Sequence, residues 1–393
     1  MKTYPPRLSH TGNVPWTAVL VLASTSLLGG PGHAQTLTAE FTGAGYTMLD
    51  LGSITDLPTN YGGLTIRSDQ PNTLYIGGAA NQITGAVYAV PLVRDAVTNS
   101  IIGFAGPATH FVDAPYIDGG LTFTPGGTLL FTQYPINAMG QILPDQTYVS
   151  SALTPLGVIS SVGSHAFVPN GFPGAGDLIV ASYNQWALYD LPNTIDANGM
   201  YTFSAPTAQV DVSGTASGPE GIAYVPPGSA AFIGPSMVIS AYGLGKVVAY
   251  EVDANGMPVT SSARDMVTGL TGAEGAWIDP VTGDFLFSTF GGGSRVIRVS
   301  GFEAPSGIAP TDNEQASFTV HPNPSQGQFQ LSFSDAGGVV QVEVVDPLGA
   351  TVHHAAIANG PQHTIDLSGH AAGVYAIRVR RDGTEQVKRV VLE

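Results

Sequence analysis

The chain has 393 residues and no cysteine, and its 29 Asp and Glu residues outnumber its 13 Lys and Arg residues. The net charge of −16 argues against nucleic-acid binding, which requires a basic surface. The lack of cysteine excludes disulfides and thiolate metal sites. Hydrophobic residues make up 43% of the chain and charged residues 11%, a composition that excludes an intrinsically disordered protein.

Residues 1–34 have the pattern of a secretory signal peptide. Lys2 and Arg7 precede an apolar run, 16–28, which is shorter than the roughly 20 residues that span a membrane. Small residues then lead to a predicted cleavage between Ala34 and Gln35. A buried helix is the alternative, which the following Gly-Gly-Pro-Gly disfavours. We therefore expect export through the periplasm and no transmembrane segment in the mature chain.

Five similar segments recur in the middle of the chain, each suited to a short inner strand. They are Tyr61–Ile66, Asp118–Phe123, Gly163–Val168, Pro219–Tyr224 and Ala273–Ile278. Further short strands follow each of them, and a unit of about 50 residues with four strands is typical of a β-propeller blade. We therefore predict an all-β fold in which residues 35–302 form a β-propeller, with five blades favoured over six. A two-sheet sandwich is the alternative.

The strand count also predicts the outer strands and the closure of the ring. In the second repeat we assign the third strand to Thr147–Ser150 and the fourth to Gly157–Val162. The fifth repeat lacks a fourth strand, whereas Tyr46–Ile54 is left over before the first repeat. We expect Tyr46–Ile54 to pair with Arg295–Val299, since this pairing removes an open sheet edge.

Acidic residues and one histidine stand near the starts of the predicted inner strands. They are Asp118, His165, Glu220 and Glu274. Because these strand starts converge on one mouth of a propeller channel, we expect the four side chains to lie close together. Such a group predicts a metal site, with calcium as the cation, since calcium prefers oxygen ligands. A general acid and base pair is a second interpretation, and capping of the inner strands by the glutamates is a third.

Two short motifs carry a resemblance to known propellers. Pro219-Glu220-Gly221 and Ala273-Glu274-Gly275 resemble the inner-strand motif of gluconolactonase-type and NHL-type propellers. The resemblance implies that an inner-strand glutamate ligates a divalent metal, but partner Asn and Asp residues cannot be assigned. No Gly-x-Ser-x-Gly nucleophile elbow occurs in this segment. We therefore predict a module that binds a glycan or a protein, with a metal-dependent hydrolase or lactonase as the alternative.

The composition changes after Phe302, where residues 303–315 are rich in linker residues. Six short strands with alternating apolar residues follow in 316–393, a pattern typical of a small immunoglobulin-like β-sandwich. The motifs of this segment are His321-Pro322-Asn323-Pro324-Ser325-x-Gly327, Asp346-x-x-Gly349, Gly373-Val374-Tyr375 and Lys388-Arg389-Val390-Val391.

In this order the motifs resemble the type A C-terminal sorting domain of cargo of the type IX secretion system. The resemblance implies handling by the type IX machinery, passage across the outer membrane, removal of this domain and attachment to surface polysaccharide. We therefore expect a secreted or cell-surface protein. An ordinary accessory immunoglobulin-like module is the alternative.

Overall fold

The computed structural model describes residues 35–304, 318–333, 339–346, 351–358, 362–381 and 384–392. The predicted signal peptide with Ala34, most of the predicted linker, and Gly349 of the C-terminal motifs lie outside these residues. Strands dominate the described part, whose α-helix is α1 (Ala39–Gly43). No helix in that part is long and apolar enough to cross a membrane.

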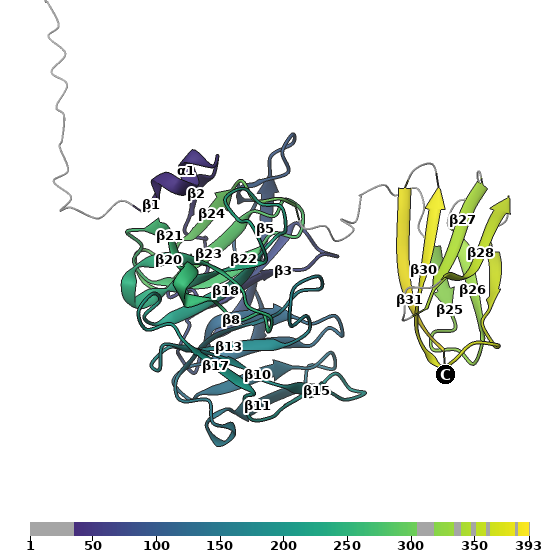
Figure 1. The fold of residues 1–393 in the computed structure, drawn as a ribbon, viewed down its shortest axis with the longest axis horizontal. Helices are drawn as coiled ribbons and strands as arrows, with labels where there is room; N and C mark the ends of the chain where they lie inside the picture. The colour runs from purple at the N-terminus through teal and green to yellow at the C-terminus, as the bar shows by residue number, and fades with distance from the viewer. Residues whose placement is uncertain are drawn as a thin grey trace, which may run out of the picture. The chain divides into compact units, whose positions relative to one another are not determined.

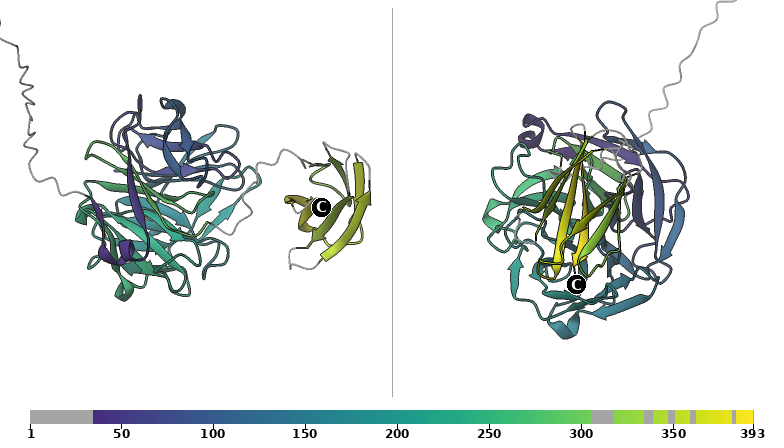
Figure 2. Two further views of the ribbon diagram at one scale, coloured as in Figure 1. Left: turned by 90° about the horizontal axis from the view of Figure 1, so that it is seen from above. Right: turned by 90° about the vertical axis from the view of Figure 1, so that its right-hand side faces the viewer.

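Five antiparallel sheets of four or five strands form the blades in residues 35–304 and lie around a common axis (Figures 1 and 2). The innermost strands are β3 (Leu64–Ile66), β8 (Ile117–Phe123), β12 (Val162–Phe167), β18 (Pro219–Val225) and β22 (Ala273–Ile278). Each of these contacts the next in this order, and β22 contacts β3, so the ring is closed. The predicted five-bladed β-propeller is therefore confirmed.

The other strands of each blade follow outward from the inner strand. Blade 1 continues with β4 (Thr73–Gly78), β5 (Ala86–Arg94), β6 (Ile101–Phe104) and β7 (Thr109–Asp113). Blade 2 continues with β9 (Leu129–Gln133), β10 (Ala138–Ile142) and β11 (Tyr148–Ala152). Blade 3 continues with β13 (Leu178–Ser182), β14 (Ala187–Asp190) and β17 (Ala208–Asp211), and carries the hairpin β15 (Asn193–Ile195) and β16 (Tyr201–Phe203). Blade 4 continues with β19 (Ser236–Ala241), β20 (Lys246–Glu251) and β21 (Arg264–Thr268), and blade 5 with β23 (Phe285–Thr289) and β24 (Val296–Ser300).

The second strand of each blade is packed on both faces. Every residue of β9, β13, β19 and β23 is buried, because each blade has a neighbouring blade on either side. A strand that is buried on both faces needs a continuous apolar run rather than an alternating pattern. This explains why these strands were the clearest to predict from the sequence.

The two N-terminal strands complete the blades at the closure of the ring. Strand β2 (Thr47–Gly52) pairs antiparallel with β24, with Thr47 opposite Ser300 and Leu49 opposite Arg298. The predicted closure by this strand is therefore confirmed. Strand β1 (Thr36–Leu37) adds a fifth strand to blade 4, with Thr36 opposite Thr268.

The strand assignment predicted for the outer part of blade 2 is wrong. Strand β10 is the third strand, and Thr147–Ser150 lies largely in the fourth strand, β11. The residues predicted as the fourth strand follow a 3-10 turn, η1 (Thr154–Leu156), and end at the start of β12. Strand β10 could not be predicted from its own residues, because Gly140 and Gln141 are not typical of a buried strand. Gly140 packs against the Phe131 ring, and the buried Gln141 amide donates to Tyr201 O at 2.8 Å.

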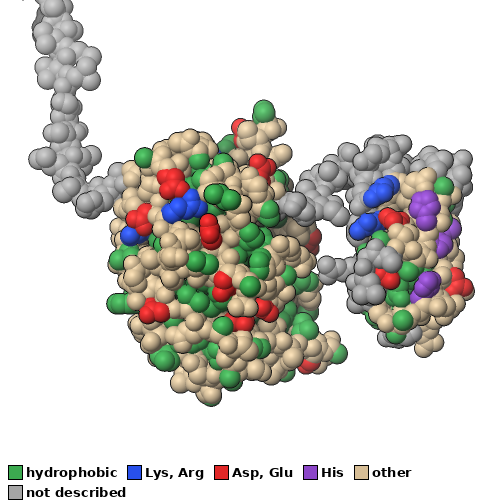
Figure 3. Space-filling model, viewed as in Figure 1, with side chains coloured by type: hydrophobic (Ala, Val, Ile, Leu, Met, Phe, Trp, Pro, Cys, Tyr) green, Lys and Arg blue, Asp and Glu red, His purple; other side chains and the backbone are tan. Residues whose placement is uncertain are grey.

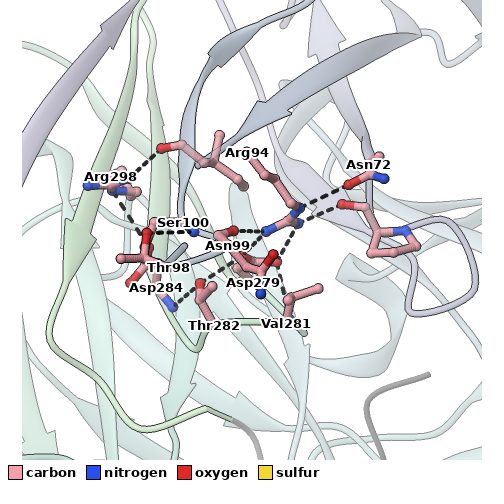
Figure 4. A network of polar contacts seen from close by, with 12 residues as sticks. Asn72, Arg94, Thr98, Asn99, Ser100, Asp279, Val281, Thr282, Asp284 and Arg298 are labelled. Carbon is pink, nitrogen blue, oxygen red and sulfur yellow. Dashed lines mark hydrogen bonds and ion pairs between the residues drawn. The ribbon is translucent and has the colours of Figure 1, made fainter. Parts of the chain in front are cut away.

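A network of polar contacts ties blade 1 to blade 5 beside the ring closure (Figure 4). Arg94 on β5 donates from both terminal nitrogens to Asp279, which follows β22, with Nη1–Oδ2 and Nη2–Oδ1 distances of 2.7 and 2.9 Å. Arg94 also donates to the Asn72 side chain and to the Asn99 carbonyl. A second pair, Arg298 and Asp284, lies beside this one with Nε–Oδ2 at 3.6 Å.

The C-terminal segment is a β-sandwich of two sheets. One sheet contains β25 (Phe318–His321), β26 (Gln328–Phe333) and β29 (Gln362–Asp366). The other contains β27 (Val339–Val345), β28 (Thr351–Ala358), β30 (Gly373–Arg381) and β31 (Thr384–Leu392). Apolar side chains from both sheets fill the space between them, including Phe329, Val342 and Ile377. The six strands predicted from 328 onward are all present.

Candidate functional site

Three carboxylates meet at one mouth of the propeller channel. Asp118, Glu220 and Glu274 occupy the second position of β8, β18 and β22, and each offers an oxygen within 4.8 Å of the other two. Their side chains are buried, with exposed fractions of 1%, 4% and 2%. We call them the acidic triad. A calcium ion with oxygens at about 2.3–2.6 Å fits among atoms at such separations.

The acidic triad is short of hydrogen-bond partners. Oδ2 of Asp118 and Oε2 of Glu220 are buried and have no partner among the described residues. Space for side chains is tight here, because a Cβ on Gly119 or Gly163 would lie 2.6 or 2.7 Å from that Glu220 oxygen. Buried carboxylates without partners are costly unless a cation or a proton neutralises them.

Burial raises the pKa of all three carboxyl groups well above their ordinary values. For Glu220 and Glu274, the negative charge of Asp118 raises the pKa further. For Asp118, hydrogen bonds from the Glu274 and Asn81 side chains lower the pKa and so offset part of the effect of burial. At neutral pH the triad therefore favours either bound protons or a bound cation.

Aromatic side chains surround the acidic triad, one from each of four blades. They are Tyr134, Tyr183, Tyr242 and Phe290, and each directly follows the second strand of its blade. Neighbouring rings in this series meet edge to face with centroids 6.4, 5.8 and 6.4 Å apart. We call them the aromatic collar. Together with the triad and Asn81, the collar encloses a cavity of about 240 Å³.

Blade 1 contributes no aromatic residue to the collar. The amide N–H groups of the collar residues donate to the carbonyls just before the inner strands, as Tyr134 does to Tyr116 O at 3.0 Å. In blade 1 the amide that makes this bond belongs to Ala80, which donates to Asn60 O at 3.0 Å. The Ala80 side chain lacks a ring, so blade 1 contributes the Asn81 amide to the cavity instead.

Glycines allow the inner strands of neighbouring blades to approach closely beside the acidic triad. One glycine per inner strand lies against the backbone of the next blade: Gly63, Gly120, Gly163, Gly221 and Gly275. A Cβ on Gly63 would lie 2.7 Å from Gly120 C, and one on Gly221 would lie 2.4 Å from Ala276 N. We call these residues the glycine belt. Only glycine permits this approach of one backbone to the next.

The structure brings together three of the four predicted mouth residues, and His165 is not among them. In β12, Val162 pairs with Ser182 and His165 with Val180, whereas in β18 the corresponding pairs are Pro219–Ala241 and Ile222–Ile239. The residue of β12 that corresponds to Glu220 is therefore Gly163, and His165 lies two positions further along the strand. The repeat alignment by sequence was one residue out of register in this blade.

The aromatic collar and Asn81 were missed by the sequence reasoning. A signal for the collar was present, because an aromatic residue follows the second apolar strand in four of the five repeats. Burial raises the pKa of Tyr183 and Tyr242, and the carboxylates of Glu220 and Glu274 raise it further. The phenol groups of the collar therefore lie within electrostatic reach of the triad.

The motif residues of the C-terminal segment join its first and last strands. Oδ1 of Asn323 accepts a hydrogen bond from Val391 N at 2.8 Å, and Ser325 N donates to Val391 O at 2.9 Å. Gly327 has φ +141°, and a Cβ there would lie 2.8 Å from the Ser368 Cβ. The Tyr375 hydroxyl donates to Ala371 O at 2.6 Å.

The remaining predicted motif residues lie on the same two sheets or at their edges. They are Pro322 and Pro324 beside Asn323, Asp346 after β27, Gly373 at the start of β30, and Lys388 and Arg389 in β31. The Lys388 Nζ lies 5.5 Å from the centre of the Phe318 ring. The motif therefore marks residues that hold the sandwich together.

Comparison with known families decides the nature of this segment. Residues 319–393 match the family described as the secretion system C-terminal sorting domain. The C-terminal segment is a type IX sorting domain. The protein is therefore cargo of the type IX secretion system, which exports it to the cell surface or the medium. No curated protein matches the sequence of the chain.

Several solved structures are similar to the chain. Virginiamycin B lyase from Staphylococcus aureus is 14% identical with a TM-score of 0.34, over 65% of this chain and 99% of its own. A putative gluconolactonase is 13% identical with a TM-score of 0.39, over 69% and 100%. A putative 6-phosphogluconolactonase from Bacteroides uniformis is 15% identical with a TM-score of 0.32, over 77% and 87%. Likenesses this low carry no argument about activity.

Proposed function

We propose that the exported protein uses its propeller to bind a glycan through a calcium ion held by the acidic triad. The observation that carries the proposal is the convergence of three buried carboxylates within 4.8 Å of one another, two of them with an unpartnered oxygen. Hard oxygen ligands with a full negative charge favour calcium over softer metals. The Asn81 amide beside the triad supplies a further oxygen for the ion or its ligand.

The surroundings of the triad support a sugar as the ligand. Sugar hydroxyls bind calcium well, and their apolar ring faces pack on aromatic side chains. The aromatic collar supplies such faces around a cavity of about 240 Å³. Residues 35–302 contain six Lys and Arg residues, and few basic side chains show on the face of the propeller drawn in Figure 3, which favours a neutral ligand over an acidic one.

A metal-dependent hydrolase or lactonase is the second candidate. The observation in its favour is the raised pKa of Glu220, whose buried and unpartnered oxygen suits a group that exchanges protons with a ligand. A cation beside it would polarise a carbonyl oxygen of the ligand. This function requires turnover, whereas glycan binding requires only a saturable complex.

The test uses the protein from residue 35 to 393 after treatment with a chelator. Calorimetry with calcium is expected to give one saturable site, which Glu220→Gln abolishes. Glu251→Gln is the matched control, because Glu251 is an exposed glutamate on β20 of the same blade. A glycan array with and without calcium, and a panel of lactones, then separate the two candidates. Equal calcium binding by Glu220→Gln and the parent protein would overturn the proposal.

A further inference from the structure

Two adjoining cavities lie at the other end of the inner strands. One has a volume of about 180 Å³ and is lined by the later residues of β8, β12, β18 and β22, including Leu121, His165 and Ile222. The other has a volume of about 380 Å³ and lies around the end of β3, Phe123 and Thr124. Trp277 lines both and stands between them. We call the pair the Trp277 cavities.

The Trp277 cavities are separate from the acidic triad. The two sites share no lining residue. Strands β8, β18 and β22 each contribute their second residue to the triad and later residues to the Trp277 cavities. The two sites are therefore distinct.

Buried polar atoms without partners gather at the Trp277 cavities. They are Oγ1 of Thr65, Oγ1 of Thr124, both ring nitrogens of His165, and Nε1 of Trp277. The exposed fractions of Thr65, Thr124 and His165 are 1%, 4% and 3%. An unpaired buried polar group costs about 1–3 kcal/mol, and such groups are rare in native proteins. Several in one place indicate a ligand that supplies the missing partners.

The chemistry of these atoms defines the ligand. The Trp277 indole can only donate, and the two threonine hydroxyls can donate as well, so the ligand must carry acceptor oxygens. Burial lowers the pKa of His165 to about 4, so its ring is neutral near pH 7 and supplies no charge.

Among the described residues, the Trp277 cavities offer a ligand no unpaired cationic side chain. Arg67 forms a bidentate pair with Asp69, with distances of 2.8 and 2.7 Å, and stacks over the Phe123 ring at 5.0 Å. The one cationic side chain lining these cavities is therefore already neutralised by its own partner. The walls are otherwise largely apolar, as Leu121, Ile222 and Ala276 illustrate.

We propose that the Trp277 cavities form a second binding site, which takes an uncharged apolar molecule with carbonyl or ether oxygens. The acceptor oxygens pair with the Trp277 indole and the threonine hydroxyls, and the apolar body fills the space beside Leu121 and Ile222. Binding here is independent of calcium, since the acidic triad takes no part.

The test uses the indole N–H signals of nitrogen-15-labelled protein, residues 35–393. Residues 35–393 contain two of the three tryptophans of the chain, Trp186 and Trp277, and Trp186 is 43% exposed and serves as the internal reference. The probe is γ-decalactone, which is uncharged and has an ester carbonyl and an apolar tail. We expect a saturable shift of the Trp277 signal with no shift at Trp186. The shift is expected to persist in Glu220→Gln, which distinguishes this site from the proposed calcium site.

Two variants decide whether the unpartnered groups hold the probe. Trp277→Phe has no Trp277 signal, so its binding is measured by calorimetry and is expected to weaken about tenfold, as the loss of one hydrogen bond predicts. Thr65→Val keeps the side-chain shape but removes the unpartnered hydroxyl, so it is expected to weaken binding of the probe. It is also expected to raise the melting temperature of the free protein, whereas removal of a hydroxyl with a structural role would lower that temperature. An unmoved Trp277 signal, an equal response to the anion decanoate, or unchanged affinity in Thr65→Val would overturn the proposal.

Discussion

Arg94 in blade 1 and Asp279 in blade 5 form a bidentate ion pair across the two blades that meet where the ring closes. The Asp279 side chain is fully buried and that of Arg94 is 11% exposed. The pair lies 185 residues apart in sequence, so it forms only when the ring is complete. It is therefore a marker of closure as well as a contributor to it.

Replacing Arg94 is expected to destabilise the propeller strongly. Arg94→Met leaves the buried Asp279 carboxylate without its cation, which costs about 3–5 kcal/mol. The matched control is Lys246→Met, because Lys246 and Asp265 form an exposed pair at 3.0 Å, with exposed fractions of 27% and 44%. A surface pair contributes about 0–1 kcal/mol. Urea denaturation of both variants measures the difference, and equal midpoints would contradict the role of the Arg94 pair.

The glycine belt leads to a second prediction. Gly63→Ala is expected to lower stability by about 1–3 kcal/mol or more, because the new methyl group meets the backbone of β8 at 2.7 Å. Gly103→Ala is the control, since a Cβ at Gly103 in β6 has no atom within 4 Å. Thermal melting measures both changes. A Gly63→Ala protein as stable as the control would mean that the inner strands can move apart.

The sequence predicted the fold well where one strand's own residues determined it. The second strands, such as β19, were clear because burial on both faces requires an unbroken apolar run. Strand β10 was missed, because its Gly140 and Gln141 suit a strand only through contacts with Phe131 and Tyr201. Such contacts between distant residues leave no local pattern.

Three of the four residues predicted for the candidate site lie together, and the fourth, His165, does not. Asp118, Glu220 and Glu274 converge because they occupy the same strand position in different blades, which repeat alignment reveals. His165 was misplaced because the repeat alignment set Gly163 against Pro219, whereas in the strand ladders Val162 occupies the place of Pro219 and Gly163 that of Glu220. A one-residue shift in a strand moves a side chain to the other face.

The sorting domain predicts how the protein is processed. In the native host, the mature surface form is expected to begin near Gln35 and to lack most of residues 316–393. Removal of residues 319–393 from the gene is expected to leave the protein in the periplasm, because the type IX machinery recognises this domain. Mass spectrometry of surface material and of periplasmic extracts measures both results. Surface protein that retains an intact C-terminus would contradict the predicted removal.

A point variant tests whether the motif acts through the sandwich structure. Asn323→Ala removes the acceptor of the Val391 amide bond, so the last strand is expected to loosen and export to fall. Gln330→Ala is the control, because the Gln330 side chain in β26 donates to the exposed Gln362 side chain on the neighbouring strand and makes no contact with the last strand among the described hydrogen bonds. Immunoblots of surface and periplasmic fractions compare the variants. Equal export of Asn323→Ala would show that this bond is dispensable for sorting.

The acidic triad makes stability depend on pH in a way that calcium reverses. Folding raises the pKa of Glu220 above its ordinary value of 4.5, so the folded protein binds that proton more tightly than the unfolded chain does. The stability that this proton contributes is complete below pH 4.5 and is lost as the pH rises through the raised pKa. Asp118 and Glu274 act in the same direction. Without metal, the melting temperature is therefore expected to fall over the pH range above 4.5.

Calcium favours the charged carboxylates and is expected to restore stability at the upper end of this range. At a calcium concentration about 100 times the dissociation constant, binding contributes about 2.7 kcal/mol. A chelator is therefore expected to lower the melting temperature at pH 8 and to have little effect at pH 4, where protons occupy the triad. Glu220→Gln imitates the protonated side chain, so it should melt higher than the metal-free parent at pH 8 and lose the response to calcium. The control variant Glu251→Gln should keep both the pH dependence and the calcium response. If the melting temperature of the parent protein is independent of pH and of calcium, the triad carries neither a shared proton nor a cation.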